Sequence, residues 1–93
     1  MTKINQVGTV ATAVLTEGGF TRVVYHNTEV VKFNQDKIIL DADRYYTATT
    51  KRRMNQASNQ FNLGFQVYQS GGEWYVDYNG DTLEFSNGME LTR

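Results

Sequence analysis

With 93 residues, the chain is long enough for a single domain over residues 1–93 with one modest hydrophobic core. It contains no cysteine and one histidine, which excludes disulfides, thiolate chemistry and any metal centre built from several histidines. The formal net charge of −1 argues against binding through overall charge, and 40% hydrophobic residues are typical of a globular protein.

The first predicted element is a strand over residues 7–15, which are rich in valine and threonine. Together with Lys3, this segment has some features of a secretion signal. Gly8, Thr9 and Thr12 dilute its apolar stretch, so we expect no export. No apolar run in the chain approaches the roughly 18 residues of a transmembrane helix, and we therefore expect no membrane partner.

Three further short strands are predicted over residues 20–26, 28–33 and 38–40. Pairing Phe33 with Ile38 and Val31 with Leu40 puts apolar side chains on one face of the sheet. Residues 44–48 are a candidate for one more short strand.

Residues 50–61 break the alternation that is typical of strands. Met54, Ala57 and Phe61 recur at spacings of three and four residues, which places them on one face of a helix. The spacing predicts a single helix that covers one open end or face of the sheet.

The C-terminal third has the clearest pattern, with alternating segments separated by turns at Gly71-Gly72, Asn79-Gly80 and Ser86-Asn87-Gly88. These turns put Val67 opposite Val76, Val76 opposite Leu83, and Leu83 opposite Leu91. The pattern predicts an antiparallel meander over residues 65–92 that keeps one apolar face.

Short strands with frequent turns and one helix predict a mainly β (α+β) fold. We expect a small barrel or half-barrel of about seven or eight antiparallel strands, with one helix near residues 50–61 and the C-terminal meander. The predicted core gathers apolar side chains from these elements: Val24, Val31, Phe33, Ile38, Leu40, Met54, Phe61, Phe65, Val67, Trp74, Val76, Leu83, Phe85 and Leu91.

A basic triplet, Lys51, Arg52 and Arg53, stands at the start of the predicted helix. Positive charge there opposes the helix dipole and costs about 0.3–1 kcal/mol per exposed charge. Two interpretations stay open. The triplet, together with Arg44, contacts an anion such as a nucleic-acid phosphate or an acidic protein surface. Alternatively, the triplet pairs internally with Asp41, Asp43 or the acidic meander.

The outer face of the meander is polar and acidic, with Tyr68 directly opposite Tyr75. This face is either solvated, with a cross-strand tyrosine pair, or a contact face for a partner.

No constellation in the sequence points to catalysis or to metal binding. His26 has no nucleophile and carboxylate at a spacing that selects a catalytic role. Asp41 and Asp43 lack a third acid at calcium-loop spacing. We therefore expect no enzyme activity, no catalytic residues, no cofactor and no bound metal.

A family resemblance rests on residues 24–31, 47–56, 67–69 and 74–76, most specifically on Thr-x-Thr-Thr-Lys-x-Arg-Met-Asn-Gln over residues 47–56. Over about residues 20–78 the chain resembles small proteins encoded by tailed bacteriophages, including phages of marine bacteria and cyanobacteria. Members commonly carry Gly-Gly before the threonine-rich motif, where this chain has Asp43-Arg44, so no tight turn is carried over. The resemblance implies a phage gene product in the cytoplasm of an infected bacterium and assigns no activity or site residue.

Three functions follow as hypotheses. The first is a non-catalytic phage accessory protein that binds a host or phage protein. The second is nucleic-acid binding through the basic start of the helix. The third is a self-associating component of the virion, joined through exposed strand edges. The candidate binding residues are Arg44, Lys51, Arg52, Arg53, Tyr68 and Tyr75.

Overall fold

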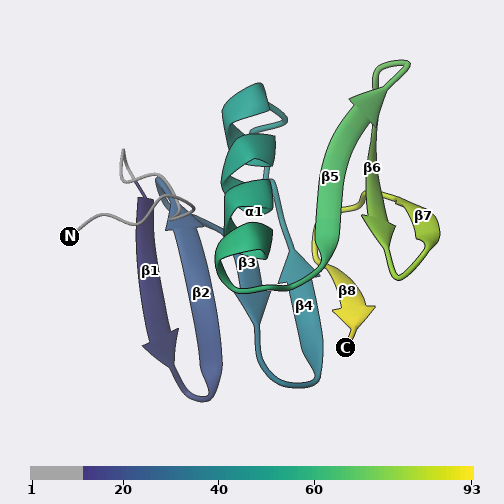
Figure 1. The fold of residues 1–93 in the computed structure, drawn as a ribbon. Helices are drawn as coiled ribbons and strands as arrows, with labels where there is room; N and C mark the ends of the chain where they lie inside the picture. Colours follow the sequence, from purple (N-terminus) through teal and green to yellow (C-terminus); the bar gives the residue numbers. More distant parts are fainter. Residues whose placement is uncertain (1–11) are drawn as a thin grey trace.

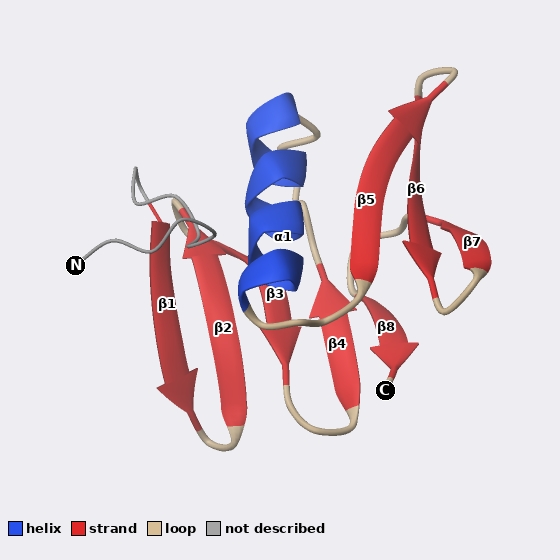
Figure 2. Cartoon of the chain, in the orientation of Figure 1, coloured by secondary structure: helices blue, strands red, loops and turns tan. Residues whose placement is uncertain are grey.

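A computed structural model describes residues 12–93, so residues 7–11 of the first predicted strand lie outside the described range. Within this range the chain forms eight strands and one helix (Figures 1 and 2). In chain order these are β1 (Thr12–Glu17), β2 (Phe20–Tyr25), β3 (Thr28–Phe33), β4 (Lys37–Leu40), α1 (Ala48–Gln60), β5 (Phe65–Ser70), β6 (Glu73–Tyr78), β7 (Asp81–Glu84) and β8 (Met89–Thr92).

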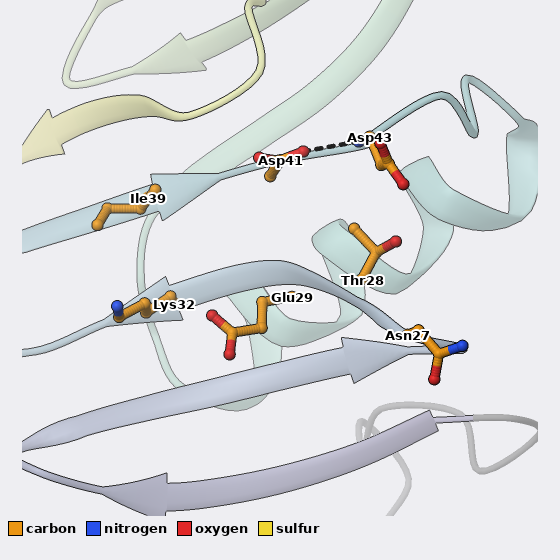
Figure 3. Close-up of a pocket in the computed structure, with 7 residues that line it drawn as sticks. All are labelled: Asn27, Thr28, Glu29, Lys32, Ile39, Asp41 and Asp43. Carbon is orange, nitrogen blue, oxygen red and sulfur yellow. Dashed lines mark hydrogen bonds between the residues drawn. The ribbon is translucent and has the colours of Figure 1, made fainter.

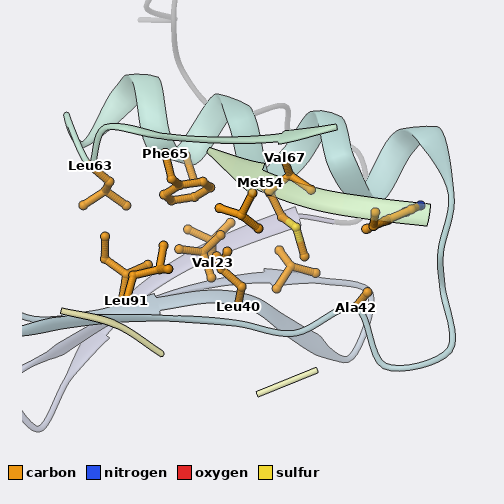
Figure 4. Packing of buried hydrophobic residues seen from close by; sticks show 14 residues of the cluster. Val23, Leu40, Ala42, Met54, Leu63, Phe65, Val67 and Leu91 are labelled. Atoms are coloured by element: carbon orange, nitrogen blue, oxygen red, sulfur yellow. The ribbon is translucent and has the colours of Figure 1, made fainter. Parts of the chain in front are cut away.

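The strands form two antiparallel sheets, one in the order β1-β2-β3-β4-β8 and one in the order β5-β6-β7. Helix α1 and β5 lie on one side of the core, and strands of the five-stranded sheet lie on the other (Figure 4). The predicted mainly β fold with one helix is confirmed. No barrel closes across the described residues, because a helix rather than another strand flanks β5.

Two-residue turns set the register of the three-stranded sheet as the sequence predicts. The φ angles are 59° and 83° in the Gly71-Gly72 turn and 52° and 83° in the Asn79-Gly80 turn, as type I′ hairpins require. Val67 pairs with Val76, and Val76 pairs with Leu83. The predicted pairing of these three strands is therefore confirmed.

The predicted pairing of the last strand of the meander with β7 is wrong, because β8 joins the five-stranded sheet instead. Leu91 stands opposite Ile38 of β4 and not opposite Leu83 of β7. The result is a buried Leu91, 2% exposed, whereas Leu83 is 36% exposed. Ser86-Asn87-Gly88 is a crossing between layers, where the Gly88 amide donates to the carbonyl oxygen of Leu40 at 2.8 Å.

Residues 44–48 are not a strand, because turn and cap hydrogen bonds occupy this segment. The amide of Tyr45 donates to the carbonyl of Ala42 at 2.8 Å. Thr47 is the N-cap of α1, and its hydroxyl accepts from the Thr50 amide at 3.2 Å. The side chain of Asn87, between β7 and β8, holds this loop by accepting from the Ala42 amide at 2.9 Å.

The core lies between the two layers, and its buried apolar side chains form one cluster (Figure 4). It includes Val31, Ile38, Leu40, Met54, Phe65, Val67, Trp74, Val76 and Leu91 as predicted, with Phe33, Phe61 and Phe85 partly buried against it. The burial of Trp74 and the position of Tyr75 on the opposite, outer face follow from the same register.

Val24 is predicted to lie in the core but does not, and a β-bulge explains the difference. The register shifts so that Val23 faces Val31 while Val24 faces Glu29, which leaves Val30 as the extra residue. Val30 and Val31 are consequently both buried, and Val23 enters the core in place of Val24.

Helix α1 takes the place of a neighbouring strand at the edge of β5. The Asn55 side chain donates to the carbonyl of Val67 at 2.9 Å and accepts from its amide at 2.8 Å. The Ser58 hydroxyl donates to the carbonyl of Phe65 at 2.7 Å and accepts from its amide at 3.0 Å. Four backbone groups of an edge strand are thereby satisfied by two side chains of one helix.

Asn55→Ala is expected to lower the free energy of unfolding by about 1–3 kcal/mol, because both partly buried polar groups of Val67 lose their partner. Urea denaturation measures this. Asn59→Ala is the matched control, since Asn59 is exposed on the same helix, and alanine there adds up to about 0.7 kcal/mol of helix propensity. Equal unfolding free energies for the two variants would contradict the assignment.

Candidate functional site

The structure brings three of the sequence-predicted binding residues together in a groove between α1 and β5. We call it the α1–β5 groove; it has a volume of about 430 Å³. Its lining residues are Ala48, Lys51, Arg52, Asn55, Gln56, Asn59, Val67, Tyr68 and Gln69. Lys51, Arg52 and Tyr68 therefore share one surface.

Arg53 points away from the groove and is 8% exposed. Its Nε donates to Thr12 Oγ1 and its Nη1 to Gln56 Oε1, both at 3.1 Å. The guanidinium carbon lies 5.6 Å from the centroid of the Tyr25 ring, within cation–π range. These contacts tie α1 to β1 and β2, so the Arg53 side chain serves the fold.

A second hollow, the aromatic pocket, adjoins the groove. The rings of Tyr46, Trp74 and Phe85 line it together with Gln69, Gly72 and the acidic Glu73, and its volume is about 440 Å³. The Tyr46 ring meets the Trp74 ring edge-on at 4.9 Å between centroids, and the Trp74 and Phe85 rings are 5.4 Å apart. Tyr46 is 50% exposed, so the cluster is open to solvent on its side.

Lys51 joins the groove to the aromatic pocket. Its ammonium lies 5.2 Å from the centroid of the Trp74 ring and donates to Gln69 Oε1 at 3.0 Å. Gln69 lines both hollows. The two hollows thus make one continuous surface that combines aromatic rings, an ammonium group and the exposed Arg52.

The remaining predicted residues lie beside this surface. Tyr75 pairs with Tyr68 across the outer face of the three-stranded sheet, with ring centroids 5.9 Å apart. The Tyr68 hydroxyl donates to Asp77 at 3.2 Å, so this face is a polar, acidic network. Arg44 lies over the Tyr45 ring at 5.9 Å in the loop before α1.

The basic triplet forms no ion pair with an acidic side chain among the described residues. The ion pairs among residues 12–93 join Arg22 to Glu17 and Glu29, and Lys37 to Glu90. None of them includes the triplet, so within the described residues Lys51 and Arg52 keep their charges without a carboxylate partner.

A further hollow on the outer face of the five-stranded sheet carries three acids and Lys32 (Figure 3). Asp41 accepts from the amide of Asp43 at 2.6 Å, and Glu29 lies 3.5 Å from the Arg22 guanidinium. In residues 12–93, no three acidic or histidine side chains are grouped so as to hold a metal ion. No helix in that range is long and apolar enough to cross a membrane.

Tyr46 is central to the site but is not among the six candidate binding residues inferred from the sequence. Its position depends on the hydrogen bonds of Asn87, which accepts from the Ala42 amide and donates to the carbonyl oxygen of Asp43 at 2.6 Å. A contact between residues more than forty positions apart has no local signal in the sequence.

A comparison with protein families places the chain among phage proteins. The family model described as Kyanoviridae Gp96 protein matches residues 2–92. No curated protein and no solved structure matches the chain. The resemblance to phage proteins inferred from the sequence is confirmed at the level of the family.

Tyr46→Ala is expected to uncover the single tryptophan, Trp74, by removing the ring that covers it. The fluorescence emission should shift to longer wavelength and acrylamide quenching should increase, with a stability loss of about 0.5–1.5 kcal/mol. Tyr45→Ala is the matched control, because Tyr45 stacks with Arg44 outside the pocket. Unchanged emission in the Tyr46 variant would contradict the packing described.

Proposed function

We propose, since this chain belongs to the Kyanoviridae Gp96 family of cyanophage proteins, that it is a phage accessory protein that binds a host or phage protein and has no catalytic role of its own. Its place of action in this proposal is the cytoplasm of the infected bacterium.

The continuous surface made by the aromatic pocket and the α1–β5 groove carries this proposal. Protein interfaces are enriched in aromatic and arginine side chains, and their strongest contacts are Trp, Tyr and Arg. Tyr46 and Lys51 lie beside the ring of Trp74, and Arg52 lines the adjoining groove. A hollow lined by rings accepts an apolar side chain, and the neighbouring cations favour an acidic one.

The division of the basic triplet favours a protein over a nucleic acid as the partner. Arg53 is held inside the fold, which leaves Lys51 and Arg52 as the cations of the groove. Two phosphate contacts give a logarithmic salt dependence of only about −2 for double-stranded DNA, too little for firm retention by charge alone. The acidic face around Asp77 would also repel a phosphate backbone.

Capture from a lysate of infected cells tests the proposal, with the wild-type chain and the Lys51→Ala/Arg52→Ala variant as baits after nuclease treatment. We expect one protein partner to be retained by the wild type and to bind the variant about tenfold or more weakly when the affinity is measured with the purified partner. Tyr46→Ala should weaken the same binding.

Lys37→Ala is the matched control, because Lys37 is a half-exposed cation on the five-stranded sheet whose pairing with Glu90 spans 3.9 Å. It should bind the partner like the wild type. Recovery of nucleic acid alone before nuclease treatment, or a partner that binds all variants equally, would overturn the proposal.

A further inference from the structure

Strand β1 is an edge strand with bare apolar side chains on both faces. Among residues 12–93 it pairs with β2 alone and lies at the end of the five-stranded sheet. Val14 is 42% exposed and Leu15 is 52% exposed, and because they point to opposite faces, each face carries an exposed apolar side chain. Helix α1 packs over β2 and β3 and reaches β1 at Thr12, through Arg53, while Val14 and Leu15 stay exposed (Figure 1).

The other sheet edges in residues 12–93 are protected, and β1 differs from them. Asn55 and Ser58 satisfy the edge of β5. Strand β7 carries Asp81 and Glu84 on an exposed edge, and charge there discourages pairing. Strand β8 is four residues long, and the Tyr78 hydroxyl donates to its Thr92 carbonyl at 3.0 Å. Residues 13–16 of β1 carry no charge and no proline.

The turn after β1 fixes which of its backbone groups face outward. Gly18 and Gly19 have φ angles of 62° and 82°, as in a type I′ turn, and Glu17 faces Phe20 as the first hydrogen-bonded pair. Because hydrogen-bonded and non-bonded pairs alternate, Leu15 bonds to β2 while Val14 and Thr16 point their N–H and C=O groups away from it.

We propose that two copies of this chain associate by antiparallel pairing of their β1 edges about a two-fold axis at Leu15. In this register Val14 of each copy faces Thr16 of the other, which makes four hydrogen bonds from the outward groups. The two five-stranded sheets then continue as one sheet of about ten strands.

The side chains of β1 suit this self-pairing on both faces. The two Leu15 side chains meet on the outer face, where they exclude water from the most exposed large apolar side chain of the described residues. On the opposite face Val14 meets Thr16, a pair of β-branched side chains. Glu17 faces Ala13 and keeps its ion pair with Arg22 at 2.9 Å, so like charges do not meet.

The paired area is small compared with the 1,200–2,000 Å² of a typical stable interface, so association should be weak and dependent on concentration. A dissociation constant of about 10 μM to 1 mM is expected. Sedimentation equilibrium of the full chain should therefore show a monomer–dimer mixture whose dimer fraction rises with concentration. A strict monomer at concentrations up to about 1 mM overturns the proposal.

Two substitutions block the edge without touching the β1–β2 ladder. Val14→Pro removes an amide donor that faces the other copy. Thr16→Lys places a charge in the contact with the other copy. Each should weaken the dimer about tenfold or more while circular dichroism shows the folded spectrum. Thr82→Lys, on the edge of β7, is the control and should leave association unchanged. Equal association of folded Thr16→Lys and wild type overturns the proposal.

Single cysteines test the register directly, because the chain has no cysteine of its own. Leu15→Cys places two thiols opposite each other on the axis, at a spacing that a disulfide spans. It should form a covalent dimer under mild oxidation much faster than Val14→Cys or Thr82→Cys. Cross-linking of all three at the same rate, or fastest at Val14→Cys, overturns the register and with it the proposal.

Discussion

The hydrogen bonds from Asn55 and Ser58 to the backbone of β5 are the constraint on which the arrangement of the layers depends. An edge strand must satisfy its outward N–H and C=O groups, and here two side chains of one helix do so. Because α1 rather than a strand flanks β5, the second sheet ends there and no barrel closes within the described residues. The α1–β5 groove lies along the same seam, so the contact that joins the layers also shapes the candidate site.

The segment 47–56, on which the phage resemblance mainly rests, builds this seam. Thr47 caps α1, Met54 enters the core and Asn55 binds β5. Arg53 fastens the helix to the first hairpin. The same segment also lines the α1–β5 groove, through Lys51, Arg52 and Gln56 among others, and the Lys51 ammonium lies between the groove and the Trp74 ring. The most specific part of the sequence therefore builds both the fold and one wall of the candidate surface.

Local patterns predict the strands and hairpins well, since type I′ turns leave one register. They do not decide the partner of β8, because Leu91 continues an apolar face beside either β7 or β4, and only long-range packing separates the two. The bulge at Val30 and the loop held by Asn87 also depend on contacts that local sequence patterns do not contain. That Arg53 points away from Lys51 and Arg52 was predictable in principle, since successive residues of a helix point about 100° apart.

The two proposed surfaces lie at opposite sides of the molecule, with β1 at one side and β5 to β7 at the other (Figure 1). Pairing through β1 therefore leaves the aromatic pocket and the α1–β5 groove uncovered and displays each of them twice. Two weak contacts, one from each copy, then give tight binding to a target that carries its binding site more than once. The reason is that the second contact forms at a high effective concentration. If both proposals hold, a chain with one small core would gain in this way the binding strength that a single modest surface lacks.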